Sequence, residues 1–304
     1  MSLDLDELRK LAVGEVLVAE PMAPHTSFRI GGPSLAMVFP TTIAEIRALM
    51  QLSQAKDVPV LVLGRGSNVL CPDEGLQAVV LNMSRLGPEP MFDHDEVVAG
   101  AGVAMSRLAR LAVQHGYTGL EFAAGIPGTF GGVLTMNAGA HGGEIAHVVH
   151  SVTVLTSDLQ VETWTKSQLG YRYRHSALQR SGMVALAGTL HLERGDLEAA
   201  RAKLKLYLEQ RRAKQPLSRP NCGSVFTNPP GGSAGALIES VGGKGRIVGD
   251  AQISDLHANF IINRGNARAR DVLSLIEWAQ NEVYRVHGIT LEPEVRILTP
   301  TIER

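Results

Sequence analysis

Residues 119–144, GLEFAAGIPGTFGGVLTMNAGAHGGE, form a glycine-rich stretch that is the most informative part of the sequence. From Phe122 to Ala140 it carries no charged residue, and its length is close to that of a membrane-spanning helix. Its repeated glycines and Pro127 disfavour such a helix, because both residue types destabilise helix interiors. We therefore interpret the stretch as a succession of tight backbone loops inside a globular protein.

Helical and strand patterns alternate on the N-terminal side of this stretch. Thr42 and Glu45 have the spacing of a capping box and are followed by apolar residues at helical intervals. Three strand patterns and a second helical pattern occupy residues 58–64, 77–83, 96–102 and 105–115. This alternation predicts an α+β or α/β unit.

Helical and strand patterns also alternate on the C-terminal side of the glycine-rich stretch. A periodic helix with a basic end is expected over 197–212, and an amphipathic helix is expected to end before Gly288. We place a domain boundary just before the first of these helices. Strands are expected at 152–158, 183–192, 258–263 and 292–298.

The composition indicates a globular protein of about two domains. The 304 residues are 44% hydrophobic and 19% charged, which excludes disorder of the whole chain. With 29 basic and 30 acidic residues, no net charge recruits nucleic acid or an anionic membrane. The two cysteines exclude a disulfide scaffold and a cysteine-rich metal site, and no metal is expected. The acidic start lacks the pattern of a secretion signal, so we expect a cytoplasmic protein.

Three glycine loops stand out, at residues 64–68, 125–132 and 137–140. The first follows a strand pattern directly, so its backbone N–H groups can converge on an anion, with Ser67 and Asn68 as side-chain partners. An ordinary tight turn would also explain each loop. Neither nucleotide fingerprint fits, because the second loop lacks a lysine and no glycine follows the first loop in the Rossmann register. A dinucleotide bound here would need another fold.

Six motifs occur in order along the chain: HTSFRIGG (25–32), LGRGSNVL (63–70), the glycine-rich stretch (119–144), YRYRHS (171–176), CGSVFTNP (222–229) and LEPEVRIL (291–298). Each motif alone is modest, but the ordered set closely resembles the UDP-N-acetylenolpyruvoylglucosamine reductase family. These flavoenzymes make UDP-N-acetylmuramate for peptidoglycan. A tyrosine-bearing loop insertion of some members is absent after Ser176, which implies the shorter subgroup.

The resemblance implies an α+β protein of three domains. Two α+β subdomains, residues 1–83 and 84–195, would form an FAD-binding fold of the vanillyl-alcohol oxidase type. Residues 196–304 would form a C-terminal α+β domain that binds the substrate, with its last strand returning to the active site.

The resemblance also implies that the glycine loops hold FAD, with NADPH as the hydride donor. The first two loops would surround the pyrophosphate, and the third would lie along the flavin. Some members have serine in place of Gly132 and tyrosine in place of His141. The expected cofactor-binding residues are Gly64, Arg65, Gly66, Ser67, Asn68, Ile126, Pro127, Gly128, Gly131, Gly132, Asn137, Gly139 and Ala140.

The implied reaction reduces the enolpyruvyl ether of UDP-N-acetylglucosamine. A hydride passes from NADPH to the flavin, and then from flavin N5 to the terminal carbon of the double bond, while a proton reaches the adjacent carbon. Hydride attack places negative charge beside an anionic carboxylate. The site therefore needs fixed positive charge, hydrogen-bond donors and a proton source.

Arg174 and Ser224 match two catalytic positions of the family. A guanidinium holds a carboxylate with two parallel hydrogen bonds. In an extended strand Arg172 would share a face with Arg174, and only the resemblance selects Arg174. Ser224 resembles the serine that protonates the enolic carbon, although a loop-capping serine is the other interpretation.

Glu294 matches the third catalytic position. If residues 294–298 form a strand, Glu294 and Arg296 point to one side, and Val295 and Ile297 point into the core. An ionised carboxylate would repel the substrate carboxylate. We therefore hypothesise that Glu294 is protonated when substrate is bound and donates a hydrogen bond. An exposed glutamate paired with Arg296 is the alternative.

Three further residues are expected to bind the substrate. Lys214 resembles a lysine that meets the substrate diphosphate, and Asn228 resembles a substrate-contacting asparagine. His257 stands where some members have glutamine, and a packing role is almost as well supported. The sequence does not give the oligomeric state or the roles of His141 and Arg172.

Two other functions are compatible with parts of the sequence. An FAD-dependent oxidase of small alcohols could share the fold, and many such oxidases attach the flavin through His or Cys; His25, His141 and Cys71 are near the flavin motifs. A non-catalytic nucleotide-binding protein is disfavoured by the joint presence of the three catalytic-type residues. Nucleic-acid binding would need a basic patch with interleaved aromatics, which the sequence lacks.

Overall fold

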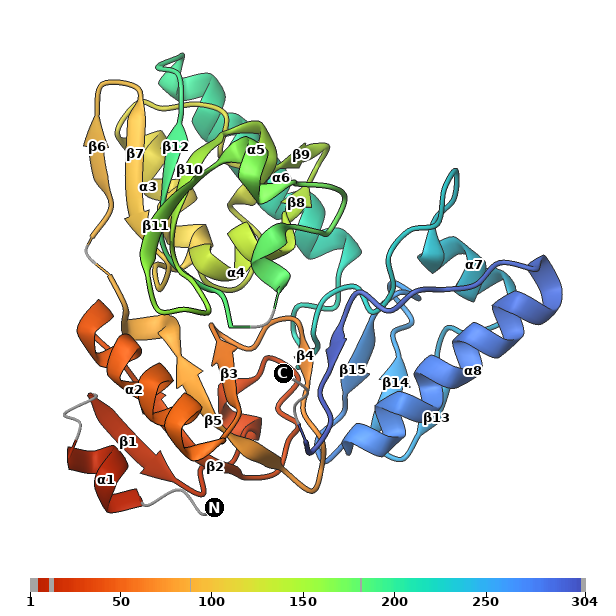
Figure 1. Cartoon of the computed structure of the whole chain (residues 1–304). Helices are drawn as coiled ribbons and strands as arrows, with labels where there is room; N and C mark the ends of the chain where they lie inside the picture. The colour runs from red at the N-terminus through yellow and green to blue at the C-terminus, as the bar shows by residue number, and fades with distance from the viewer. Residues whose placement is uncertain (1–4, 11–13, 88, 181, 302–304) are drawn as a thin grey trace.

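The computed structural model describes residues 5–10, 14–87, 89–180 and 182–301, which form three packed parts (Figure 1). The start of the chain, on which the expected cytoplasmic location rests, lies partly outside these residues. No helix within these ranges combines the length and the apolar character that crossing a lipid bilayer requires.

The first part is a four-stranded sheet in the order β1-β2-β5-β3, with β1 antiparallel to β2 and the other pairs parallel. The predicted capping box begins the helix α2: Thr42 Oγ1 accepts from Glu45 N at 3.2 Å, and Glu45 Oε2 accepts from Thr42 N at 3.1 Å. The elements are α1 (Leu5–Lys10), β1 (Glu15–Val18), η1 (Ala23–His25), β2 (Ser34–Phe39), α2 (Ile43–Lys56), β3 (Val60–Leu63), β5 (Leu76–Asn82) and η2 (Met83–Arg85).

The second part is a five-stranded antiparallel sheet in the order β11-β10-β12-β7-β6. A Cβ atom added to Gly188 of β12 would lie 2.9 Å from the ring of Phe130, so the glycine allows helix α4 to pack directly on the sheet. The elements are β6 (Met91–Asp93), β7 (Glu96–Gly100), α3 (Met105–Gln114), η3 (Glu121–Ala123), α4 (Phe130–Met136), η4 (Ile145–His147), β10 (Val149–Leu155), β11 (Val161–Thr165), α5 (Lys166–Leu169), η5 (Ala177–Gln179) and β12 (Val184–His191).

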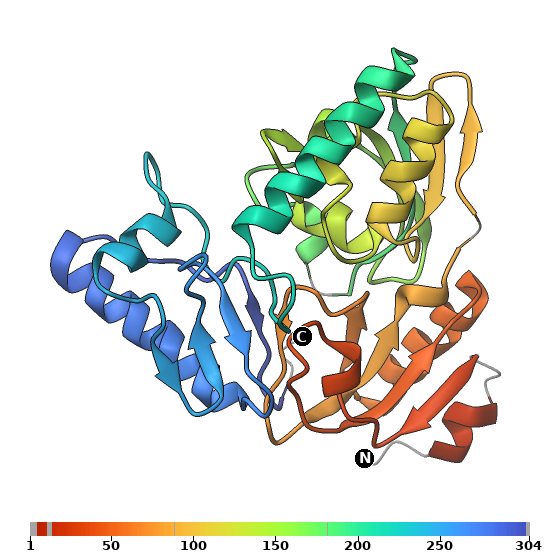
Figure 2. The ribbon, with the colours of Figure 1, turned by 180° about the vertical axis from the view of Figure 1, so that it is seen from behind.

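The glycine-rich stretch belongs to this second part. It supplies η3, α4 and a small hairpin of β8 (Gly139–Ala140) and β9 (Gly143–Glu144). Helix α6 (Leu197–Lys214) also packs here, because Leu204, Tyr207 and Leu208 join the core of the second part (Figure 2). The expected boundary at residue 196 assigns α6 to the third domain, whereas its packing contacts lie with the second part.

The third part is the three-stranded sheet β13-β14-β15, packed against α8. Its core includes Phe28 and Ile30 from the first part. Helix α8 ends where predicted, with Gly288 in a left-handed conformation of φ 66°. The elements are α7 (Ala234–Ser240), β13 (Ile247–Val248), β14 (Ala251–Ile253), β15 (Ile261–Asn263) and α8 (Ala269–His287).

The final strand is much shorter than the one expected over 292–298. β16 (Arg296–Ile297) pairs in parallel with β4 (Val69–Leu70), which returns the chain to the first part beside the loop at 64–68. The predicted alternation is correct for the buried Val295 but wrong for Ile297, which is 37% exposed. A strand of two residues is too short to impose a regular two-residue periodicity.

Candidate active site

The first glycine loop follows β3 and meets the second glycine loop. Gly66 has a φ of 59°, a left-handed conformation that favours glycine. A Cβ atom added to Gly64 would lie 2.4 Å from Thr129 Oγ1, and one added to Gly128 would lie 2.7 Å from Ser67 Oγ. The loops can therefore approach each other this closely only because these positions lack side chains.

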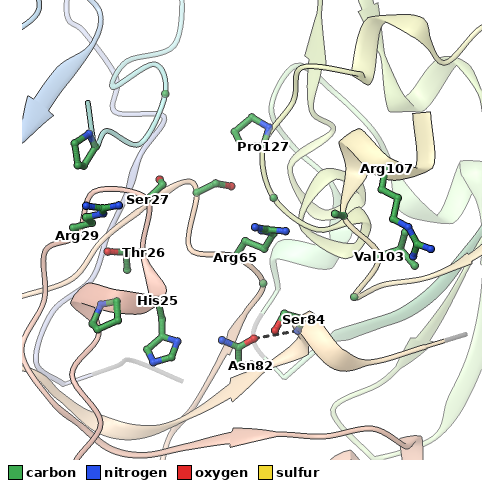
Figure 3. A pocket seen from close by; sticks show the side chains of 18 of the residues that line it. His25, Thr26, Ser27, Arg29, Arg65, Asn82, Ser84, Val103, Arg107 and Pro127 are labelled. Carbon is green, nitrogen blue, oxygen red and sulfur yellow. Dashed lines mark hydrogen bonds between the residues drawn. The ribbon is translucent and has the colours of Figure 1, made fainter. Parts of the chain in front are cut away.

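A cavity of about 1000 Å³ lies beside the two loops (Figure 3). Its lining includes Gly64, Arg65 and Ser67 of the first loop and Pro127 and Gly128 of the second. Segments from all three parts of the molecule complete the wall. The loops expected to surround a pyrophosphate thus face one common space.

The cavity is strongly cationic. Among the residues that the structure describes, Glu89 is the one carboxylate in the lining, and it accepts a hydrogen bond from Arg107 at 2.6 Å. Four more lining arginines have no ion-pair partner among the residues described: Arg29, Arg65, Arg211 and Arg219. The size and the charge of the cavity fit an elongated ligand with a pyrophosphate, as FAD is.

Sequence reasoning missed most of the charged and polar residues that line this cavity. Arg29 lies inside the HTSFRIGG motif and Arg211 at the basic end of α6, so both belong to segments that the sequence distinguishes. Asn82, Arg85 and Arg107 lie in ordinary strand, turn and helix segments, and no sequence pattern distinguishes them.

Asn137 ends α4 and connects the third glycine loop to the YRYRHS motif. Its side chain is fully buried, with Nδ2 donating to the carbonyl oxygen of Arg172 at 2.9 Å and Oδ1 accepting from Ala146 N at 3.1 Å. Both ends of the amide are therefore bonded within the protein. Any contact between Asn137 and a cofactor would have to come from its main chain.

The YRYRHS motif is not extended, so the condition under which Arg172 and Arg174 would share a face is not met. Arg172 and His175 exchange two backbone hydrogen bonds of 3.0 Å, which close a tight turn, and Arg174 has a φ of 53°. The buried amide of Asn137 bonds one residue of this turn and so supports it. Within the turn, the Arg172 side chain is exposed and Arg174 is partly buried.

The Arg174 guanidinium joins Glu294 to the third glycine loop. Its Nε donates to Glu294 Oε1 at 2.8 Å, and its Nη2 donates to the carbonyl oxygen of Gly139 at 3.2 Å. The two side chains are only 21% and 16% exposed. The alternative pairing of Glu294 with the exposed Arg296 is not observed.

Glu294 is anchored by its backbone to two other motifs. Its N–H donates to the carbonyl oxygen of Val225 at 2.8 Å, and its own carbonyl oxygen accepts from Asn68 Nδ2 at 3.0 Å. Burial raises the pKa of the Glu294 carboxyl above its usual value, and the charge of Arg174 offsets this rise only in part. A protonated carboxyl is thus easier to form here than at a surface site.

Ser224 lies next to these contacts. Gly223 on one side lines the cavity, and Val225 on the other accepts the hydrogen bond from Glu294. Ser224 is half-buried, and its hydroxyl makes no hydrogen bond within the described chain. The backbone bond between Glu294 and Val225 therefore brings the chain at Ser224 close to the chain at Glu294, although Ser224, Arg174 and Glu294 themselves do not line the cavity.

The three expected substrate-binding residues are less directly connected. Lys214 is exposed at the end of α6. Asn228 Oδ1 accepts from the first N–H of α7 at 3.0 Å. His257 packs edge-on against Phe260, with ring centroids 4.9 Å apart, and burial lowers its pKa. Within the described residues, no hydrogen bond or ion pair joins these three to the Arg–Glu pair.

His141 packs on the protein's own helix. Its ring stacks flat on Tyr207 of α6, with centroids 4.1 Å apart. Burial lowers the pKa of His141, and so do the nearby charges of Arg211 and Lys214. The imidazole of His141, which stands where some members of the family have tyrosine, is therefore held beside the basic end of α6.

Two family matches define the chain as an FAD-binding oxidoreductase. Residues 34–163 match the family model described as an FAD binding domain. Residues 215–298 match the model described as the C-terminal domain of UDP-N-acetylenolpyruvoylglucosamine reductase. These two matches leave unmatched only the N-terminal segment, the region that contains β12 and α6, and the last few residues.

Relatives match over nearly the whole chain. The UDP-N-acetylenolpyruvoylglucosamine reductase of Heliobacterium modesticaldum is 43% identical over 94% of this chain and 91% of its own length, and that of Synechococcus elongatus is 45% identical over 92% and 93%. The crystal structure of the Thermus caldophilus enzyme has a TM-score of 0.80 at 34% identity, covering 94% and 98%. The chain therefore belongs to the UDP-N-acetylenolpyruvoylglucosamine reductase family, and the expected FAD-binding α+β fold is confirmed.

Proposed function

We propose that this chain reduces the enolpyruvyl ether of UDP-N-acetylglucosamine to UDP-N-acetylmuramate, with FAD as cofactor and NADPH as hydride donor. The contact between Arg174 and Glu294 carries the proposal, because it joins two distant motifs beside the third glycine loop. The substrate is a small molecule, and the reaction takes place in the cytoplasm.

The cationic cavity and the loops around it would hold FAD. Gly64, Gly66 and Gly128 allow a pyrophosphate to approach the loop backbone, and Arg65 and Ser67 add donors. When bound, the flavin supplies the hydride that the double bond accepts. The other residues proposed to contact the cofactor are Asn68, Ile126, Pro127, Gly131, Gly132, Asn137, Gly139 and Ala140.

Arg174 would bind the substrate carboxylate. Its hydrogen bonds to Glu294 and to the Gly139 carbonyl hold the guanidinium in place before the substrate arrives. A cation fixed at this point stabilises the negative charge that develops beside the carboxylate in the transition state.

Glu294 would become protonated once the substrate carboxylate binds the guanidinium of Arg174. Without its counter-charge, the carboxyl experiences only the effect of burial, which raises its pKa. The neutral carboxyl of Glu294 then donates a hydrogen bond to the substrate instead of repelling it.

Ser224 would supply the proton to the carbon next to the carboxylate. Its hydroxyl has no competing hydrogen bond within the described chain, and its neighbour Val225 is fixed by the backbone of Glu294. Lys214, Asn228 and His257 would also contact the substrate, with Lys214 near the diphosphate and His257 near the carboxylate.

A flavin attached through Cys71, as in the oxidase alternative, is disfavoured. The Cys71 side chain is fully buried, and burial raises the pKa of its thiol to about 12. A thiol in this state is a poor nucleophile.

The absorbance spectrum of the purified protein tests the cofactor, the hydride donor and the substrate together. We expect the bands of oxidised flavin, their loss on addition of NADPH, and their return on addition of UDP-N-acetylglucosamine enolpyruvate. A colourless protein that takes up no FAD would overturn the proposal. A yellow protein that does not oxidise NADPH in the presence of substrate would refute the reductase activity alone.

Glu294→Gln is expected to lower kcat by about 10²-fold, because the glutamine amide is a far weaker acid than the carboxyl and donates a weaker hydrogen bond to the developing charge. The wild-type enzyme needs the protonated carboxyl, so its activity should fall as the pH rises through the raised pKa of Glu294. Glutamine does not ionise, and that alkaline decline should be absent from the variant. The pH dependence of kcat for both proteins provides the measurement.

Glu292→Gln is the matched control, because Glu292 is exposed and lies two residues before Glu294. This control should keep both the wild-type rate and the wild-type pH profile. Near-wild-type turnover by Glu294→Gln would count against any role of Glu294 in holding a proton.

A further inference from the structure

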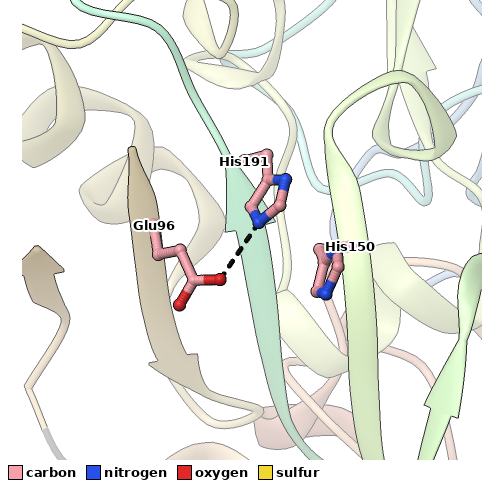
Figure 4. A group of neighbouring side chains, drawn as sticks. All are labelled: Glu96, His150 and His191. Carbon is pink, nitrogen blue, oxygen red and sulfur yellow. Dashed lines mark hydrogen bonds and ion pairs between the residues drawn. The ribbon is translucent and has the colours of Figure 1, made fainter. Parts of the chain in front are cut away.

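Three metal-binding side chains gather on the exposed face of the five-stranded sheet: Glu96 of β7, His191 of β12 and His150 of β10 (Figure 4). These strands are consecutive neighbours in the sheet. The ligand atoms of the three side chains all lie within 4.8 Å of one another. None of the three lines the cationic cavity, so the group is separate from the proposed reductase site.

The strand register places Glu96 directly opposite His191. The two residues are partners in the antiparallel pairing of β7 and β12, and His191 Nε2 lies 3.0 Å from Glu96 Oε1. Directly opposed residues project from the same face of a sheet. Leu190, the preceding residue of β12, points into the core, so His191 points to the open face.

A β-bulge brings His150 to this face. The register between β10 and β12 shifts between Val149 and Ser151, which leaves His150 without a partner residue. Val149 is buried, whereas His150 is exposed. The His150 ring stacks on the His191 ring, with centroids 4.1 Å apart and an angle of 17° between the planes. The bulge thus adds a second imidazole to the group.

We propose that Glu96, His150 and His191 bind a Zn²⁺ ion, with water in the fourth position. Two imidazoles and one carboxylate are a ligand set that this ion uses. Ligands about 2.1 Å from a tetrahedral ion lie about 3.4 Å apart, close to the 3.0 Å between His191 and Glu96. The ligand atoms of all three side chains already lie within 4.8 Å of one another, so rotation of the exposed His150 ring can bring its nitrogen to the ion.

Calorimetric titration of the untagged, chelator-treated holoenzyme with ZnCl₂ tests the site. One equivalent of Zn²⁺ should bind to the wild-type protein. His150→Ala, His191→Ala and Glu96→Gln should each weaken the affinity at least about tenfold, because each removes one ligand. All three should keep wild-type flavin absorbance and NADPH-dependent turnover, since the side chains are exposed and lie outside the cavity.

His94→Ala is the matched control. His94 is also exposed and lies 2.7 Å from the carboxylate of Asp93, but it belongs to no group of three metal-binding side chains in the described chain. Its substitution should leave the Zn²⁺ affinity unchanged. The proposal is wrong if wild-type protein binds Zn²⁺ no more tightly than the His150→Ala/His191→Ala double variant, or if His94→Ala weakens binding as much as His191→Ala does.

Discussion

Ser224→Ala is expected to lower kcat by about 10²–10⁴-fold, the usual contribution of a positioned general acid. Ser224 is half-buried and follows Gly223, which lines the cavity, and its other neighbour Val225 is fixed by the hydrogen bond from Glu294. A methyl group in place of the hydroxyl cannot supply the proton that completes reduction of the double bond. Protonation by water would then limit turnover.

Rapid-mixing absorbance measurements separate the two halves of the cycle for Ser224→Ala. Bleaching of the flavin bands by NADPH needs no proton from Ser224 and should keep its wild-type rate. The return of the bands on addition of substrate should slow by the same factor as kcat, about 10²–10⁴-fold. Ser218→Ala is the matched control, because Ser218 lies six residues before Ser224 and lines the cavity but is exposed. Equal slowing of both halves in Ser224→Ala would indicate general damage to the site and not the loss of a proton donor.

The boundaries of several elements were predictable because their signals are local. The capping box at Thr42 and Glu45 begins α2, and Gly288 ends α8 with a left-handed φ. The length of β16 and the packing of α6 depend instead on distant partners, which are β4 for β16 and the core of the second part for α6. No local pattern carries that information.

Local patterns also do not show which residues of the candidate site come together. Arg174 and Glu294 are 120 residues apart in the chain, and only the resemblance pointed to both before their contact was seen. The YRYRHS motif alternates in a way typical of a strand, yet it forms a turn that the buried amide of Asn137, 35 residues from Arg172, supports. The cationic cavity likewise combines arginines from distant segments of the chain, and no local pattern predicts that these segments meet.

Arg174→Ala is expected to lower kcat/KM by about 10²–10³-fold, the usual loss when a donor to a developing charge is removed. The guanidinium is held by Glu294 and by the carbonyl of Gly139, so the cation is fixed before the substrate binds. Arg174→Lys should recover only a small part of the loss, because an ammonium keeps the charge but not the planar pair of donors. Steady-state kinetics with NADPH and the enolpyruvyl substrate measures both variants.

Arg172→Ala is the matched control, because the Arg172 side chain is exposed and only its backbone takes part in the turn. Its kcat/KM should stay at the wild-type value. Arg174→Ala also leaves Glu294 buried without its counter-charge, which costs stability as well as activity. The Arg174→Ala/Glu294→Gln double variant removes that unpaired charge. If the double variant regains thermal stability and turns over as fast as Glu294→Gln alone, Arg174 serves only to neutralise Glu294; stability regained with turnover well below that of Glu294→Gln is the result expected for a catalytic guanidinium.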